Sequence, residues 1–187
     1  MNLISEDYKN QLSALHSKKK TFGINSNKDS YNSIKYIDRY NPKSILDYGC
    51  GKGSMISFLK ENYTDIIIEG YDPGVLEFSI LPTKKYDMVI SSDVLEHVEH
   101  QFIDNVLQHI DSLFVHNAVL LIASSPAKKT LPDGRNAHLI QEGLDWWEEK
   151  ISNNINASIV EKQYTDRYHK KGDVFRNKKE VFFLLTK

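Results

Sequence analysis

The sequence predicts an α/β protein whose doubly wound, mostly parallel sheet ends in an antiparallel hairpin. Short apolar runs alternate with segments in which apolar residues recur at helical spacing. Strands that alternate with helices form parallel sheets. The last part of the chain instead offers two strands in succession, residues 156–164 and 180–186, joined by a polar loop. Strands that follow one another directly pair antiparallel, so we expect a terminal hairpin.

The strands of the parallel part are short and strongly apolar. Residues 44–48 read SILDY, residues 65–72 contain three consecutive isoleucines, residues 86–91 read YDMVIS and residues 115–123 read VHNAVLLIA. Continuous apolar runs of this length are typical of strands that are buried on both faces of a sheet.

Helices are expected between these strands. Apolar spacing predicts helices over about 28–40, ended by Asn41-Pro42, and over about 55–62. A longer pattern predicts a helix directly after the third strand, through Val94, Leu95, Val98, Phe102, Val106, Ile110 and Leu113. Asp145 and Glu148 have the spacing of a capping box, which predicts a helix over 146–153. Residues 1–27 are polar and weakly patterned, and predict no particular element.

Length and composition limit the class of protein. The 187 residues suit one domain, since domains usually have roughly 100–200 residues. Lys and Arg number 24 against 25 Asp and Glu, so no overall charge draws the chain to nucleic acid or anionic lipid. Its single cysteine, Cys50, excludes an internal disulfide framework and fits a reducing cytoplasm. Without a signal-like N-terminus or a long apolar run, we expect a cytoplasmic protein with no membrane association.

A glycine-rich turn, Gly49-Cys50-Gly51-Lys52-Gly53, follows the first strand and precedes a helix. Ligands of such sheets bind at the carboxyl ends of the strands, and glycines let a ligand approach the backbone. A dinucleotide fingerprint is excluded because Ser54 follows Gly53, which leaves the spacing Gly-x-Gly-x-Gly. No Gly-Lys-Ser/Thr follows either, which excludes a Walker-type phosphate loop.

Over residues 40–150 the chain resembles the class I S-adenosylmethionine-dependent methyltransferases. Their first motif is matched by Leu46, Asp47, Gly49, Cys50, Gly51 and Gly53, and Ser92-Asp93-Val94-Leu95-Glu96-His97-Val98 resembles a segment of the ubiquinone-biosynthesis-like subgroup. The resemblance implies S-adenosylmethionine as cofactor, bound by Asp47, Gly49, Cys50, Gly51, Gly53, Asp72, Pro73, Ser92 and Asp93. Asp72 would accept hydrogen bonds from the ribose hydroxyls. Residues 1–40 would form a helical lid on a methyltransferase domain of residues 41–187.

The chain departs from the family pattern after Asp72. Only 13 residues separate Asp72 from Tyr86, so the usual helix and third strand are shortened. The acid that often contacts adenine in this family is missing, and Glu77 could take its place.

The expected reaction is O-methylation of a small-molecule acceptor such as a sugar, a lipid precursor or another metabolite. A hydroxyl acceptor must lose a proton, and His97 and His138 are the candidate general bases because imidazole titrates near neutral pH. His97 could equally orient its loop without taking part in the chemistry. Two other classes stay open: an RNA methyltransferase that holds phosphate with Lys128, Lys129 and Arg135, and a non-catalytic cofactor-binding module.

A metal site is an alternative interpretation of the segment that follows the third strand. In a helix that begins at Asp93, the side chains of Asp93, Glu96, His97 and His100 would share one face. The run Asp-x-x-Glu-His, followed by a later histidine, is similar to a motif of the metal-dependent methyltransferases that methylate the 2′-hydroxyl at the ends of small RNAs. The metal-free subgroup shares the Glu-His pair, so the sequence leads us to expect no metal.

Overall fold

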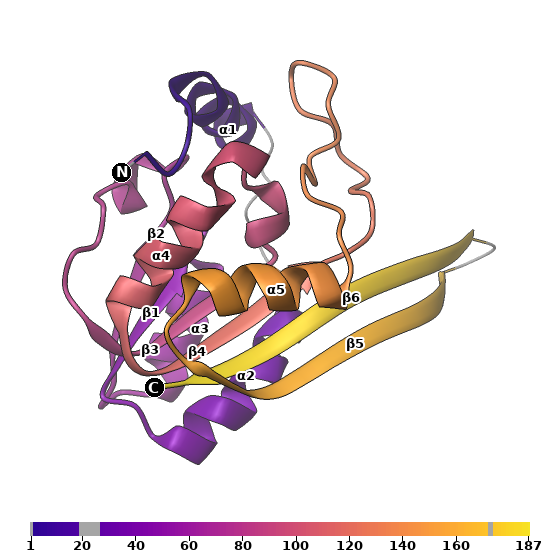
Figure 1. The fold of residues 1–187 in the computed structure, drawn as a ribbon. Coiled ribbons are helices and arrows are strands. Elements are labelled where there is room, and N and C mark those ends of the chain that lie inside the picture. The colour runs from indigo at the N-terminus through magenta and orange to yellow at the C-terminus, as the bar shows by residue number, and fades with distance from the viewer. Residues whose placement is uncertain (1, 19–26, 172–173) are drawn as a thin grey trace.

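The computed structural model describes residues 2–18, 27–171 and 174–187 and shows a six-stranded sheet in the order β2-β1-β3-β4-β6-β5 (Figure 1). The strands are β1 (Ser44–Tyr48), β2 (Ile67–Tyr71), β3 (Tyr86–Ser92), β4 (Phe114–Ala123), β5 (Ser158–Lys171) and β6 (Val174–Thr186). Neighbouring strands from β2 to β4 are parallel, whereas β6 is antiparallel to β4 and β5 is antiparallel to β6. The predicted fold class is therefore confirmed.

Strand register brings the ends of three strands together. Asp47 of β1 is level with Gly70 of β2 and with Ile90 of β3. The carboxyl ends of β1, β2 and β3 therefore open onto the same edge of the sheet, which is where ligands of doubly wound folds bind.

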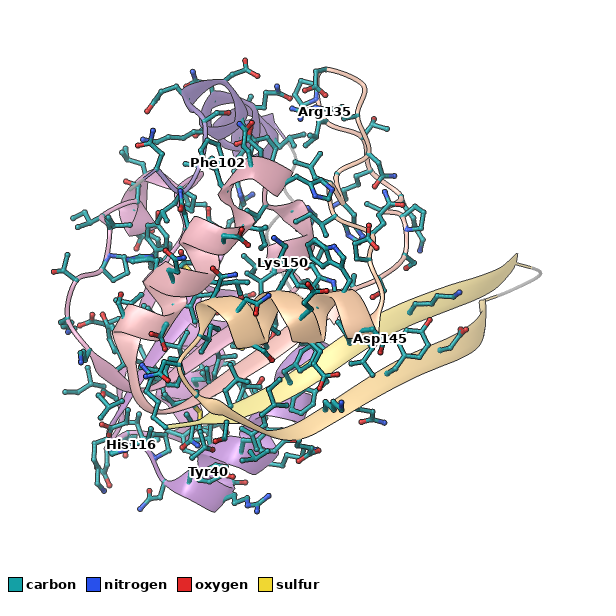
Figure 2. The ribbon with its side chains drawn as sticks, in the orientation of Figure 1. Tyr40, Phe102, His116, Arg135, Asp145 and Lys150 are labelled. Carbon is teal, nitrogen blue, oxygen red and sulfur yellow. The ribbon has the colours of Figure 1, made fainter. Side chains whose placement is uncertain are left out.

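Helices cover both faces of the sheet. Helices α2 (Asn27–Tyr40) and α3 (Ser54–Asn62) bury Ile37 and Leu59 against one face, and α4 (Ile103–Leu113) and α5 (Leu144–Asn154) bury Ile110 and Trp147 against the other. Lys150 Nζ, on α5, lies 2.9 Å from Asp104 Oδ1, on α4, which ties these two helices together (Figure 2).

An additional helix, α1 (Glu6–Lys18), lies near the loop of residues 124–143, outside the two helical layers (Figure 1). It buries Tyr8 and Leu15 in a small cluster with Leu131 and Ala137 of that loop. Apolar residues are few in this helix, which is why the sequence pattern predicted no element before residue 27. In the described residues no helix combines the length and apolarity that a membrane span requires.

The predicted long helix after the third strand is wrong in its first half. Asp93 has φ 55°, and Val98 and Glu99 are extended, with ψ 140° and 135°. Residues 95–102 form two short 3-10 turns instead, η2 (Leu95–His97) and η3 (His100–Phe102), and α4 begins at Ile103. Leu95 is buried in the core like a helical residue, so the apolar spacing runs unchanged through the turns.

Two further boundaries differ from expectation, whereas the segment between β2 and β3 is short, as the sequence predicted. The polar loop predicted after residue 164 continues as β5 and β6, in which residues 165–171 pair with residues 174–180, so that the facing backbone groups of the two strands bond one another. Helix α5 begins at Leu144 after Gly143, so Asp145 lies inside the first turn and does not cap it. Between β2 and β3 the only helical element described is the single turn η1 (Leu76–Phe78), which leaves β2 at the edge of the sheet.

Candidate cofactor and acceptor site

The glycine turn after β1 adopts a backbone that other residues would strain. Gly49, Gly51 and Gly53 all have positive φ, of 84°, 53° and 75°. A Cβ atom on Gly49 would lie 2.3 Å from the Val94 side chain, so the turn passes directly against the segment that follows β3. Gly53 precedes α3, whose first-turn N–H groups have no partner within the helix.

Asp72, at the end of β2, is bound to this turn. The N–H of Gly51 donates to Asp72 Oδ2 at 2.9 Å, and the N–H of Gly74, beyond Pro73, donates to Oδ1 at 2.8 Å. The N–H groups of Gly49 and Cys50 donate to the carbonyl of Tyr71 at 2.7 and 3.1 Å. These bonds fix the carboxylate, and its remaining lone pairs can accept hydrogen bonds from a diol.

Asp47 of β1 is a second buried carboxyl group, near Asp72. Burial, followed by the charge of Asp72, raises the pKa of Asp47 to about 8. Cys50 is buried beside Gly70 at the back of the turn, and burial raises the pKa of its thiol, so it packs as a small neutral side chain. Open glycine backbone and the fixed carboxylate of Asp72 suit a ligand that carries a diol, as S-adenosylmethionine does.

The other expected cofactor residues flank the same turn. Ser92 is buried at the end of β3, and the N–H of Asp93 donates to Leu121 O at 3.0 Å. Glu77 is exposed on η1, whereas Phe78 of that turn approaches Gly53 so closely that a Cβ there would lie 2.9 Å from its ring. Phe78 is thus a better candidate for contact with an adenine ring than Glu77.

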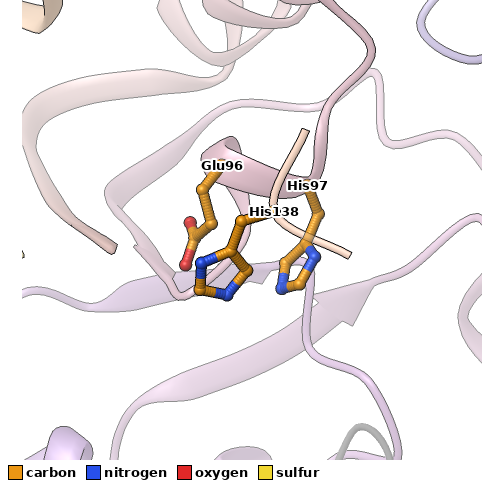
Figure 3. A group of neighbouring side chains, drawn as sticks. All are labelled: Glu96, His97 and His138. Carbon is orange, nitrogen blue, oxygen red and sulfur yellow. The ribbon is translucent and has the colours of Figure 1, made fainter. Parts of the chain in front are cut away.

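The two candidate bases, His97 and His138, meet although 40 residues separate them. Their rings lie 4.8 Å apart at 84°, and Figure 3 shows both beside the carboxylate of Glu96. His97 Nδ1 lies 2.6 Å from Ala137 O, and His138 Nδ1 lies 2.5 Å from Ser125 O. Burial, then the neighbouring His138, lowers the pKa of His97 to about 4, and burial lowers the pKa of His138. Both imidazoles are therefore neutral near pH 7.

The four side chains that the sequence places on one helix face as possible metal ligands do not share a face in the structure. Because residues 93–102 are not helical, Asp93, Glu96, His97 and His100 do not share a helix face. His100 is exposed on η3, with its ring near Trp146. His138 stands beside Glu96 and His97 instead.

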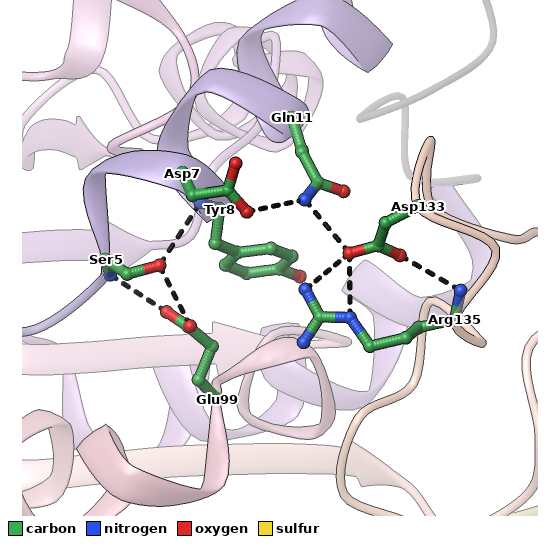
Figure 4. A network of polar contacts seen from close by, with 7 residues as sticks. All are labelled: Ser5, Asp7, Tyr8, Gln11, Glu99, Asp133 and Arg135. Atoms are coloured by element: carbon green, nitrogen blue, oxygen red, sulfur yellow. Dashed lines mark hydrogen bonds and ion pairs between the residues drawn. The ribbon is translucent and has the colours of Figure 1, made fainter.

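Helix α1 adds residues that the sequence did not single out. Ser13 Oγ donates to Gly74 O at 3.2 Å, and His16 Nε2 lies 4.0 Å from Asp72 Oδ1. The start of the helix is bound to Glu99, which accepts hydrogen bonds from the N–H and the hydroxyl of Ser5, both at 2.9 Å (Figure 4). No motif in residues 1–27 indicated these contacts, since they depend on packing between distant segments.

The loop after β4 closes over the same edge. Asp133 accepts a hydrogen bond from Gln11 of α1 at 3.0 Å and forms an ion pair with Arg135 at 2.7 Å (Figure 4). The Arg135 guanidinium holds the pKa of Asp133 well below its usual range. Arg135, one of the three basic residues considered for binding phosphate, is therefore engaged with a carboxylate.

Comparison with known proteins agrees with this geometry. A family model described as "Methyltransferase domain" matches residues 21–172, and no curated protein matches the chain. Among solved structures, the 1,6-didemethyltoxoflavin-N1-methyltransferase of Burkholderia thailandensis, bound to S-adenosylhomocysteine, has a TM-score of 0.69 at 12% identity, over 100% of this chain and 92% of that one.

Two further structures share the fold. TehB from Haemophilus influenzae has a TM-score of 0.64 at 13% identity, over 95% of this chain and 67% of its own. The magnesium protoporphyrin IX methyltransferase of Synechocystis PCC 6803, also bound to S-adenosylhomocysteine, has a TM-score of 0.56 at 20% identity, over 84% of this chain and 80% of its own.

The chain belongs to the methyltransferase-domain family, and it is an enzyme of the class I fold. Family membership and the glycine turn together identify S-adenosylmethionine as its cofactor.

Proposed function

We propose that this methyltransferase transfers the methyl group of S-adenosylmethionine to an oxygen atom of a small molecule. The observation that carries the proposal is the Asp72 carboxylate, which the N–H groups of Gly51 and Gly74 hold at the mouth of the glycine turn. Asp72 would bind the ribose diol of the cofactor, and the backbone of the glycine turn would lie against the cofactor. Ser92 and Asp93, after β3, would flank its methionine end.

The acceptor would lie on the side of His97 and His138. A hydroxyl acceptor must give up a proton, and a neutral imidazole nitrogen within reach can accept it. Since each Nδ1 faces a backbone carbonyl, Nδ1 carries the ring hydrogen and Nε2 carries the lone pair. Placing the acceptor in line with the methyl group contributes more than the base, about 7–11 kcal/mol of barrier reduction.

A small acceptor fits the covered site better than a polymer. Helix α1 and the loop of residues 124–143 are joined by the buried cluster of Tyr8, Leu15, Leu131 and Ala137 and by the Gln11–Asp133 hydrogen bond. Within the segment 1–40, which the sequence predicts to be a lid on the domain of residues 41–187, we propose that α1 acts as the lid, because α2 buries Ile37 against the sheet as part of the domain. Residues 19–26 of this segment lie outside the described part. A cover of this kind encloses a small molecule and restricts a long chain.

Isotopically labelled S-adenosylmethionine tests the proposal. After incubation with cell extract divided into metabolite and RNA fractions, we expect label in a small molecule, on an oxygen atom by mass spectrometry. Label in RNA would support the alternative that Lys128 and Lys129 bind phosphate, and label in neither fraction would support a non-catalytic module.

In parallel, Asp72→Asn should weaken S-adenosylhomocysteine binding more than tenfold in calorimetry, with the exposed Asp65→Asn as the matched control. Equal binding by both variants contradicts the ribose assignment.

A further inference from the structure

Three side chains with metal-binding atoms converge beside the proposed acceptor position. Glu96, His97 and His138 each offer a ligand atom, and these atoms lie within 4.8 Å of one another. Glu96 and His97 come from the single turn η2, and His138 comes from the loop after β4 (Figure 3). Two ligands in a tetrahedral site, each about 2.1 Å from the ion, are about 3.4 Å apart, so side-chain shifts that together amount to about 1.4 Å or less would complete a shared site.

Both imidazoles are prepared to act as ligands. A metal-binding histidine usually donates its other ring N–H to a carbonyl or carboxylate, which fixes the ring and directs the lone pair. His97 has this arrangement with Ala137 O, and His138 has it with Ser125 O. Each ring is held through Nδ1 by the backbone of the loop after β4, so each Nε2 atom is available.

The carboxylate of Glu96 completes the set. Glu96 is fully buried, and its Oε1 accepts a hydrogen bond from the N–H of Ala123 at 3.2 Å. Its own carbonyl accepts from the N–H of Ile140, two residues beyond His138, so the backbone ties η2 to the loop that carries the third ligand. A buried carboxylate is stabilised by a cation beside it.

We propose that Glu96, His97 and His138 bind one divalent transition-metal cation, of the Mn²⁺ or Zn²⁺ kind. Two imidazoles and one carboxylate favour such ions over Mg²⁺ and Ca²⁺, which prefer oxygen ligands throughout. Three protein ligands leave coordination positions open for an acceptor oxygen. This inference departs from the sequence-based expectation of no metal, which rests on the Glu-His pair that the metal-free subgroup shares; the position of His138 beside that pair is the additional observation.

The site gives these residues a role in the proposed reaction, and that role rests on the proposed function. A cation lowers the pKa of a hydroxyl bound to it. The acceptor O–H bond then breaks with loss of its proton to water, and the oxygen lone pair forms the new bond to the methyl carbon. The bond between sulfur and that carbon breaks, and its electron pair stays on sulfur. The two histidines would then position the acceptor and would not act as its base.

Calorimetric titration of the chelator-treated protein with MnCl₂, ZnCl₂ and MgCl₂ tests the site directly. We expect one site per chain, with Mn²⁺ and Zn²⁺ binding at least tenfold more tightly than Mg²⁺. His138→Ala and Glu96→Gln should each weaken Mn²⁺ binding at least tenfold, and circular dichroism checks that both variants fold. Gln keeps an oxygen that can accept from Ala123, so Glu96→Gln removes the charge with little change of shape.

The matched control is His100→Ala, which removes an exposed histidine from the neighbouring turn and should leave the affinity for Mn²⁺ unchanged. Folded His138→Ala protein that binds Mn²⁺ as tightly as the wild type overturns the proposal, as does loss of binding in His100→Ala alone. S-adenosylhomocysteine binding, measured on the same samples, separates the two proposals. Cofactor binding without a metal site overturns only the metal proposal, and a metal site without cofactor binding overturns only the proposed function.

Discussion

Asp47 is a buried acid whose protonation couples folding to pH. Its pKa is raised to about 8 by burial and by the charge of Asp72, whereas an unfolded chain leaves it near 3.9. The folded state therefore holds this proton more tightly than the unfolded state. The contribution of Asp47 to the free energy of unfolding is greatest below about pH 4 and is lost as the pH rises towards 8.

Asp47→Asn should remove this pH dependence, because the amide is neutral in both states. At pH 8.5 the variant should be more stable than the wild type by at least about 1 kcal/mol, and at pH 4 this difference should vanish. Urea denaturation at the two pH values measures it. The exposed Asp65→Asn is the control, and an Asp47→Asn variant that shows no gain at pH 8.5 would mean that the buried carboxyl costs the wild type nothing.

Single residues also show why the sequence predicted one half of the site better than the other. Asp47, the three glycines and Asp72 lie at the ends of consecutive strands, so strand order alone brings them to one edge. His138 reaches Glu96 and His97 only through the path of the loop after β4. That path depends on backbone hydrogen bonds that no spacing in the sequence encodes. The sequence pattern therefore grouped His100, and not His138, with Glu96 and His97.

Among the elements, strands were easier to predict than turns. Strands β1, β3 and β4 are continuous apolar runs because both of their faces are buried, and their predicted bounds agree with the structure within one residue. The helix predicted from Val94 to Phe102 was wrong because the short turns in this stretch bury Leu95 in the core at a spacing that a helix would also give. The apolar pattern did not indicate helix α1, which lies in the helical segment that the family resemblance implies, because much of its contact is polar and is made with distant loops.

Glu99 holds the start of helix α1, which makes the proposed lid testable. Glu99→Ala removes the acceptor of both Ser5 hydrogen bonds, and each such bond contributes about 0.5–1.5 kcal/mol. We expect amide hydrogen exchange of residues 6–18 to accelerate about tenfold and S-adenosylhomocysteine to dissociate several times faster. Mass spectrometry and stopped-flow displacement measure the two effects.

Glu61→Ala, on the exposed side of α3, is the control for this lid experiment. Exchange in residues 6–18 that is the same in both variants would show that Glu99 does not hold the helix. Faster exchange without faster ligand release would show that α1 is attached through Glu99 but does not cover the cofactor.

At the scale of the whole molecule, the cofactor site joins parts that otherwise pack separately. The glycine turn leads into α3, on one face of the sheet, while residues 92–97 lead towards α4, on the other, and α1 reaches Asp72 through His16. A binding site that is formed by all three segments exists only in the folded state, so a ligand of this site binds the folded chain alone. Its binding free energy therefore adds to the stability of the whole domain.

Thermal unfolding measures this coupling. S-adenosylhomocysteine at 100 times its dissociation constant should add about 2.7 kcal/mol, which raises the Tm of a chain of this size by roughly 5–10 °C. At the same ligand concentration, a tenfold weaker Asp72→Asn variant gains only about 1.4 kcal/mol and should show about half of the shift. Equal shifts in the two proteins would place the ligand away from Asp72. If thermal unfolding showed two separate transitions and the ligand raised the Tm of only one of them, the site would not link the two faces of the sheet.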